Sequence, residues 1–159
     1  MKNEEVIRLF DAYSDDLYRF AVYYVGSKHD AEDIVQDVFL KLLSKHVVLK
    51  HGKERAYLMT MTANSCKNYL KSAFRKTNVD IELAEMELQY FDDFTERNRE
   101  VFDELMRLEG QYRIPIYLHF YVGYSYKEIA KIINISESLV AVRINRGKAK
   151  LRINLEELL

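Results

Sequence analysis

The stretch 124–152, YSYKEIAKIINISESLVAVRINRGKAKLR, constrains the fold more than any other part of the chain. Its first half places apolar residues on one helical stripe, formed by Ile129, Ala130, Ile132 and Ile133. Asn134 then interrupts the pattern, and Asn is, after Gly, the residue that most readily adopts a left-handed backbone at a helix end. The stretch is therefore expected to begin with a short surface helix that buries one side.

Ser136 is expected to open a second helix, because its hydroxyl can accept a hydrogen bond from a free backbone amide. This helix is expected to bury Leu139, Val140 and Ile144. Its other positions carry the basic residues Arg143, Arg146, Lys148, Lys150 and Arg152. Since the small Ala130 would let two helices cross closely, the pattern favours a helix-turn-helix that binds DNA. An ordinary helical hairpin with a solvated basic face is the alternative.

Helix breakers are scarce in the whole chain, which has one Pro and five Gly among 159 residues. With 48% hydrophobic and 31% charged residues, the composition excludes a disordered chain and favours an all-helical protein. No apolar run approaches the length of about 20 residues that a membrane span needs, and the acidic start differs from a signal peptide. We therefore expect a cytoplasmic protein without membrane insertion. The single cysteine, Cys66, excludes an internal disulfide, and neither a metal nor a cofactor is expected.

Charge is distributed unevenly along the chain, although its net value is only −1. Residues 1–75 carry 12 basic and 10 acidic side chains, 76–110 carry 4 and 11, and 111–159 carry 8 and 4. Two mildly basic blocks that flank an acidic one are typical of two DNA-facing modules joined by a linker. Chance segregation of surface charge is the alternative.

An acidic helix is predicted in the first basic block. It is expected to begin around Asp30, whose carboxylate can cap free backbone amides. Opposite its apolar stripe lie the polar side chains of Glu32, Asp33, Gln36 and Asp37. Such a face is usually only a solvated surface. A metal or acid–base role for its paired carboxylates is rejected, because no His or further carboxylate is spaced to complete a site.

A basic helix is predicted over residues 54–75. Aromatic side chains lie among its cations, which suits a nucleic-acid strand because phosphates bind the charges and exposed bases can stack. Most of these aromatics are nevertheless expected in the core. Residues 77–96 form an acidic linker, after which a helix is expected to close at Gly110. Pro115 is expected in the first turn of the next helix, which Gly123 would end.

Three segments in this order resemble an extracytoplasmic-function sigma factor of bacteria: DAEDIVQDVFLKLL at 30–43, RAYLMTMTANSCKNYLKSAFRK at 55–76, and the stretch 124–152. The resemblance covers nearly the whole chain and leaves only the linker without a motif. It implies an all-α protein of two small helical domains: sigma region 2 over 1–76, the linker over 77–96, and sigma region 4 with its helix-turn-helix over 97–159.

The function that this resemblance implies is promoter recognition. In the family, region 2 binds the clamp helices of the RNA polymerase β′ subunit and opens the −10 element, while region 4 reads the −35 element and touches the β flap. The chain would thus be a sigma factor for core RNA polymerase, with no enzymatic activity and with an anti-sigma factor as a partner. Two alternatives stay open: a helix-turn-helix regulator that binds duplex DNA without polymerase, and a helical interaction protein without a DNA function.

Candidate site residues follow from the same resemblance. The polymerase-facing surface would comprise Asp30, Glu32, Asp33, Gln36 and Asp37. The strand-capture surface, which follows the separated promoter strand, would comprise Asn64, Lys67, Asn68, Lys71 and Arg75. The recognition helix would use Ser136, Glu137, Ser138, Arg143, Arg146 and Lys148. Side chains early in that helix can meet base edges, and later basic residues are better placed for phosphates.

The recognition helix also departs from the family pattern. Members often have Gly-Thr where this chain has Ser138 and Leu139, and a Lys-Ser pair where it has Ala141 and Val142. Because apolar side chains lose hydrogen bonds to DNA, an unusual or weaker base readout is expected. Gly147 costs about 1 kcal/mol relative to Ala in mid-helix. Two explanations remain for it: a bend in the helix, or close approach to another backbone.

Overall fold

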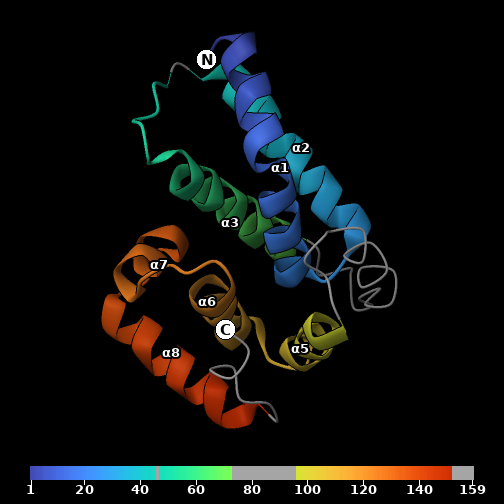
Figure 1. The fold of residues 1–159 in the computed structure, drawn as a ribbon, viewed down its shortest axis with the longest axis vertical. Coiled ribbons are helices and arrows are strands. Elements are labelled where there is room, and N and C mark those ends of the chain that lie inside the picture. Colours follow the sequence, from blue (N-terminus) through green and yellow to red (C-terminus); the bar gives the residue numbers. More distant parts are fainter. Residues whose placement is uncertain (46, 73–95, 152–159) are drawn as a thin grey trace. The chain divides into compact units, whose positions relative to one another are not determined.

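A computed structural model describes residues 1–45, 47–72 and 96–151, among which all regular structure is helical (Figure 1). The expected all-α fold is confirmed. The chain divides into two compact units, 1–79 and 80–159. The predicted linker 77–96 lies outside the described residues except for Glu96, which begins a helix. Within the described parts, no helix is long and apolar enough to cross a membrane.

Unit 1 is built from α1 (Asn3–Val25), α2 (Lys28–Ser44) and α3 (Glu54–Ser72), each of which packs against the other two. Their apolar stripes form the core, in which Leu9, Phe20, Val38, Leu42, Leu58 and Met59 are buried. Gly26 ends α1 in the left-handed conformation at φ 73°, and its amide donates to the carbonyl of Val22.

The start of α2 differs from the prediction. Ser27 is its N-cap, with the hydroxyl accepting a hydrogen bond from the amide of Asp30 at 3.4 Å. The predicted cap, Asp30, therefore lies three residues after the N-cap that the structure shows. Ser27 adopts the extended backbone that an N-cap needs, so Asp30 lies inside the first turn of α2 and not at its cap.

Unit 2 contains α5 (Glu96–Met106), α6 (Gly110–Ile116), the π-helical segment η1 (Tyr117–Tyr121), α7 (Tyr126–Ile133) and α8 (Glu137–Lys150). Two local predictions are wrong here. Gly110 begins α6 instead of ending the helix before it, because Glu109 already has the extended backbone of an N-cap. Pro115 lies beyond the first turn, and since it has no amide N–H, the ordinary helical bond to Gln111 is missing just before η1.

The helix-turn-helix is confirmed as local structure by α7 and α8. Asn134 adopts the left-handed conformation at φ 56° and ψ 53°, and the Ser136 hydroxyl accepts a hydrogen bond from the amide of Leu139 at 3.1 Å. At the other end of α7, Ser125 and Glu128 form a reciprocal capping box. The S-x-x-E spacing that signals this box is present in the sequence and was missed.

The surroundings of Gly147 show which of its two explanations holds, a bend in α8 or a close approach of α8 to another segment. A Cβ atom at this position would lie 2.5 Å from Cδ1 of Ile116 and 3.0 Å from Cβ of Tyr112. Both neighbours belong to α6, and α8 continues past Gly147 as regular helix to Lys150. The missing side chain therefore lets α8 pack closely against α6.

Candidate nucleic-acid and protein interfaces

The polar face of α2 retains most of the side chains predicted for the polymerase-facing surface. Asp33 and Gln36 are exposed, while Glu32 and Asp37 are half-buried. The carboxylate of Asp37 forms an ion pair of 2.9 Å with Lys41, one turn later on the same helix. This face is accessible and carries more negative than positive charge.

Asp30 is separated from that face by the packing of the helices. Its residue surface is only 5% exposed, and its Oδ2 atom accepts a short hydrogen bond from the hydroxyl of Tyr69 on α3. A buried carboxylate is retained where it is hydrogen-bonded. Asp30 thus joins α2 to α3 and presents little surface to a partner.

The predicted strand-capture residues within the described region share one face of α3. Asn64, Asn68 and Lys71 are exposed, Lys67 is half-buried, and the buried residues Leu58, Thr62 and Cys66 belong to the opposite side. Arg75 lies outside the described residues. The aromatic Tyr57 is half-buried on this polar face, seven residues before Asn64, whereas Tyr69 is turned toward α2. The face combines cations with amides, a set that can bind phosphates and base edges.

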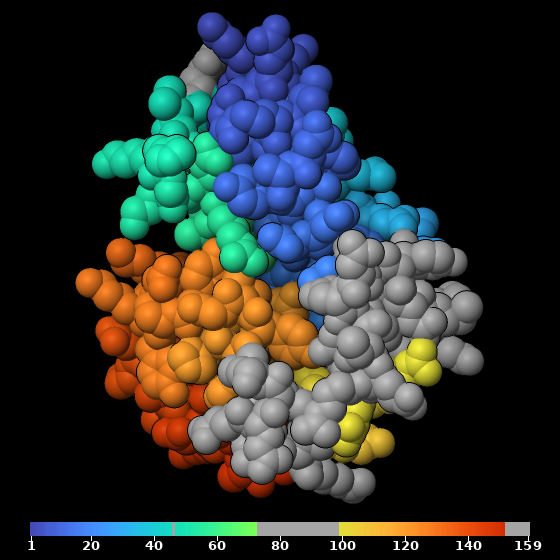
Figure 2. Space-filling view, viewed as in Figure 1, coloured from blue at the N-terminus to red at the C-terminus, as the bar shows by residue number. Residues whose placement is uncertain are grey.

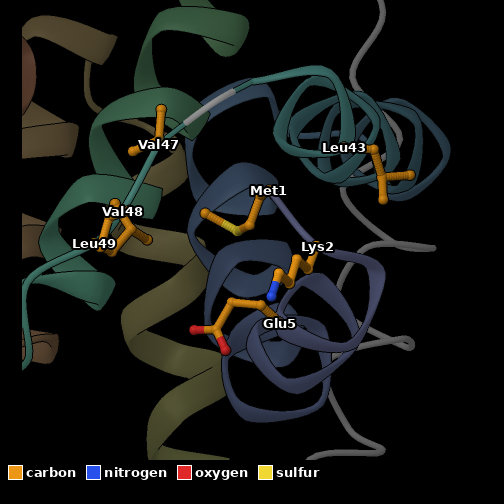
Figure 3. A pocket seen from close by; sticks show the side chains of 7 residues that line it. All are labelled: Met1, Lys2, Glu5, Leu43, Val47, Val48 and Leu49. Atoms are coloured by element: carbon orange, nitrogen blue, oxygen red, sulfur yellow. The ribbon is translucent and has the colours of Figure 1, made fainter.

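A shallow groove of about 280 Å³ connects the two surfaces of unit 1. Residues from α2 and α3 line it, among them Asp33, Asp37, Asn68 and Tyr69. An apolar cavity of about 620 Å³ lies elsewhere in unit 1, between the start of α1 and the segment after α2 (Figure 3). Its lining, which includes Met1, Leu43 and Val48, shares no residue with the three predicted surfaces.

Arg8 of α1 holds the start of α3 through charged hydrogen bonds. Its Nη2 atom lies 2.6 Å from Oε1 of Glu54 and 2.5 Å from Oε1 of Glu5, and Tyr13 donates to Oε2 of Glu54 at 3.2 Å. The hydrogen bond from Arg8 lowers the pKa of Glu54. Burial, followed by the bond to Glu54, raises the pKa of Tyr13. This cluster fixes the helix that carries the strand-capture surface.

The recognition helix α8 and its partner α7, orange to red, form part of the visible surface in Figure 2. On α8, Val140, Ile144 and Gly147 are buried. Of the predicted DNA-contacting residues, Ser136, Glu137, Ser138 and Arg146 are exposed, whereas Arg143 and Lys148 are half-buried.

Lys148 has an internal contact that the sequence did not reveal. Its Nζ atom lies 5.5 Å from the centroid of the Phe120 ring, and that of Lys150 lies 5.2 Å from the Tyr112 ring. Cation–π contacts of this length are attractive. Together with the close packing at Gly147, they attach the last turns of α8 to α6 and η1.

The exposed face of α8 also includes three residues outside the predicted set of DNA-contacting side chains. Leu139, expected in the core, is 36% exposed; Val142 is 40% exposed, and Asn145 is exposed as well. The prediction that Leu139 is buried is wrong, because Val140 and Ile144 already fill the contacts of α8 with α7 and α6. The helical spacing from Ser138 to Val142 to Asn145 was the signal that could have identified this face.

No group of His, Cys, Asp and Glu side chains within the described ranges is arranged to hold a metal ion. Cys66 is buried, and burial raises the pKa of its thiol well above the usual range. Its thiolate is therefore strongly disfavoured, as expected of a packing residue.

Comparisons with known proteins agree with this arrangement of two units. Residues 9–76 match the family described as Sigma-70 region 2, and residues 98–151 match Sigma-70, region 4. The chain is 28% identical to the ECF RNA polymerase sigma factor SigX of Bacillus subtilis over 93% of its own length and 82% of that protein. It is 31% identical to BldN of Streptomyces coelicolor over 84% of its own length, but spans only 53% of that relative.

Solved structures share the fold at lower identity. One is the sigma factor RpoE in complex with the anti-sigma factor NepR from Bartonella quintana, with 21% identity, a TM-score of 0.68, and coverage of 98% of this chain and 94% of that one. Another is CnrH in complex with the cytosolic domain of CnrY, with 24% identity, a TM-score of 0.65, and coverage of 99% and 88%.

Proposed function

Because this chain belongs to the sigma-70 family, in its extracytoplasmic-function group, we propose that it binds core RNA polymerase and directs promoter recognition and DNA melting. The observation that carries the proposal is the match of two family regions, in the expected order, to the two units of the fold. In this proposal the chain is not an enzyme. It acts in the cytoplasm, where it directs core polymerase to specific promoters.

Unit 1 binds the polymerase through α2 in this proposal. Glu32, Asp33, Gln36 and Asp37 contact the clamp helices of the β′ subunit, and their accessibility supports this assignment. Asp30 acts differently, since its carboxylate is buried against Tyr69. Its role is to hold α2 and α3 together beneath the two contact surfaces.

The polar face of α3 captures the separated strand of the −10 element. Asn64 and Asn68 can hydrogen-bond base edges, while Lys67, Lys71 and Arg75 bind phosphates. Unstacking a base costs a few kcal/mol. The captured strand and the polymerase contacts must together supply that free energy.

Unit 2 reads the −35 element and touches the β flap. Ser136, Glu137 and Ser138 begin α8, where side chains can reach base edges in the major groove. Arg143 and Arg146 follow one to two turns later and bind phosphates or guanines. Lys148 contributes a charge close to the DNA while its ammonium group rests near Phe120.

An anti-sigma factor is the remaining proposed partner. The solved structure of RpoE, which has the same fold, is a complex with the anti-sigma factor NepR, and this likeness motivates the proposal. Such a partner would cover the DNA-facing surfaces of both units and keep the chain from polymerase.

The test is transcription by a reconstituted holoenzyme. Purified chain is added to core polymerase on fragments of its own genome, and transcript starts are mapped. Initiation from defined promoters is expected, and it should disappear when Asp33 and Gln36 are both replaced by Ala. If the chain never joins core polymerase but binds duplex operators tightly alone, it is a regulator and the proposal fails.

A further inference from the structure

The exposed face of α8 has an apolar centre. Successive residues of an α-helix are about 100° apart, so Val142, two residues from each of the buried Val140 and Ile144, faces directly away from them. Leu139 lies one turn earlier beside it, since residues three apart are neighbours on a helix surface. These two side chains are 40% and 36% exposed, respectively.

This apolar centre lies where a recognition helix reads bases. Leu139 is the third residue of α8 and Val142 the sixth, in the part of the helix that enters deepest into the major groove. Ser138 and Arg146 lie one turn before and after Val142 and are exposed. The apolar pair is therefore surrounded by groups that suit DNA, including a guanidinium that attracts phosphate.

The major groove offers one apolar group to such side chains, the C5-methyl of thymine. The polar groups on the base edges there are hydrogen-bond donors or acceptors, which an aliphatic side chain cannot satisfy. Contact with a methyl group removes apolar surface of both partners from water and needs no hydrogen bond.

We propose that Leu139 and Val142 determine promoter specificity by contacting the C5-methyl groups of thymines in the −35 element. This inference rests on the proposed function and deepens it, because it assigns the base chemistry that α8 reads. Asn145, exposed one turn after Val142, can pair with adenine through its N6 and N7 atoms, so the same face is suited to A·T pairs.

The decisive experiment removes single methyl groups from the DNA. The probe is a promoter duplex mapped in the transcription test, in which each thymine of the −35 element, on either strand, is replaced in turn by uracil. Holoenzyme containing the full chain should bind at least one uracil duplex about fourfold more weakly, the effect of losing the burial of one methyl-sized group.

Substitutions of Val142 and Leu139 test whether these two side chains cause the weaker binding of the uracil duplex. Val142→Ser and Leu139→Ser, which leave no methyl group at either position, should bind thymine and uracil duplexes equally at the position that each side chain contacts. Both residues are exposed, so the melting temperature should stay unchanged. Ala149→Ser, on an exposed position of the same helix beyond the base-reading turns, is the matched control and should keep the wild-type ratio.

Three results overturn the inference in distinguishable ways. If wild-type holoenzyme initiates at the promoter but binds all uracil duplexes as well as the thymine duplex, methyl readout is excluded and the proposed function stands. If the variants lose affinity for a protein partner while their uracil ratios match those of the wild type, the apolar pair is a protein-binding surface. Absence of any promoter binding by the holoenzyme would defeat the proposed function as well.

Discussion

The hydroxyl of Tyr69 donates a hydrogen bond to the buried carboxylate of Asp30, and this contact joins the first turn of α2 to the last turns of α3. Tyr69 directly follows Asn68, which belongs to the strand-capture surface. Asp30 lies three residues before Asp33, which belongs to the polymerase-facing surface. One internal contact thus fixes the distance between two surfaces that have different proposed partners.

Removing this hydrogen bond should weaken strand capture without weakening attachment to polymerase. Tyr69→Phe leaves a buried carboxylate short of a donor, which costs about 1–3 kcal/mol. We expect a lower free energy of unfolding in urea and weaker binding of a single-stranded −10 oligonucleotide by the holoenzyme. Affinity for core polymerase should remain within twofold of the wild type, since Tyr69 is not part of the α2 face.

Asp33→Asn is the matched control, because Asp33 is an exposed carboxylate on the same helix as Asp30. It should leave stability unchanged and reduce core affinity. Should Asp30→Asn reduce core affinity as strongly as Asp33→Asn while leaving stability intact, Asp30 contacts polymerase directly and its positioning role is refuted.

Gly147 and Ile116 should be energetically coupled. Gly147→Ala gains about 1 kcal/mol of helix propensity, but its Cβ would overlap Cδ1 of Ile116, and overpacking costs about 1–3 kcal/mol. We expect a net loss of stability. Ile116→Val removes that Cδ1 atom, so the double variant should be more stable than the sum of the single changes predicts.

Thermal or urea unfolding of the four proteins in this cycle measures the coupling. An additive result would mean that α8 can shift away from α6 at no cost. The recognition helix would then be positioned by other contacts, such as those of Lys148 and Lys150 with their aromatic rings.

Acid should destabilise unit 1 partly through Glu54. Its pKa is lower in the folded protein than in the unfolded chain, chiefly because Arg8 donates to it. Its contribution is therefore complete above the unfolded value, near 4.5, and is lost as the pH falls through the folded value. Glu54→Gln should flatten the dependence of stability on pH below about 4.5, the ordinary value.

The matched variant for this test is Glu4→Gln, which changes an exposed glutamate in the first turn of α1. Its curve of unfolding free energy against pH should follow the wild type. Identical curves for Glu54→Gln and the wild type would show that the Arg8 cluster adds no pH-dependent stability.

Cys66 should be unreactive in the native protein. Because its side chain is buried and its thiol pKa is raised, iodoacetamide should modify it only when unit 1 unfolds. Mass spectrometry should show little modification in buffer at pH 8 and complete modification in urea. Rapid modification in buffer would show that α3 opens locally, which would then also affect the strand-capture surface.

Much of the fold could be predicted from the sequence because it depends on neighbours within one turn. Asn134 and Ser136 form their turn and cap with residues at most five positions away, and Val140 and Ile144 follow helical periodicity. The capping box of Ser125 and Glu128 is equally local, because its two residues are three positions apart.

The remaining features depend on residues far apart in the chain. Asp30 looks like a surface carboxylate until Tyr69, 39 positions later, is seen to cover it. The need for Gly147 arises from Ile116 and Tyr112 on α6. Leu139 has the apolar character of a core residue, and only the filled contacts around Val140 show that the core has no place for it.

The division of α8 into a buried stripe and an exposed reading face has a consequence for how such proteins diversify. Val140, Ile144 and Gly147 maintain the fold, while Leu139, Val142 and Asn145 can change with little effect on it. Mutations can therefore accumulate on the reading face without a stability threshold to limit them. Under the proposed base readout, two or three substitutions on this face would direct a duplicated copy of the chain to a new set of genes, and α8 would be a suitable starting point for orthogonal promoter pairs.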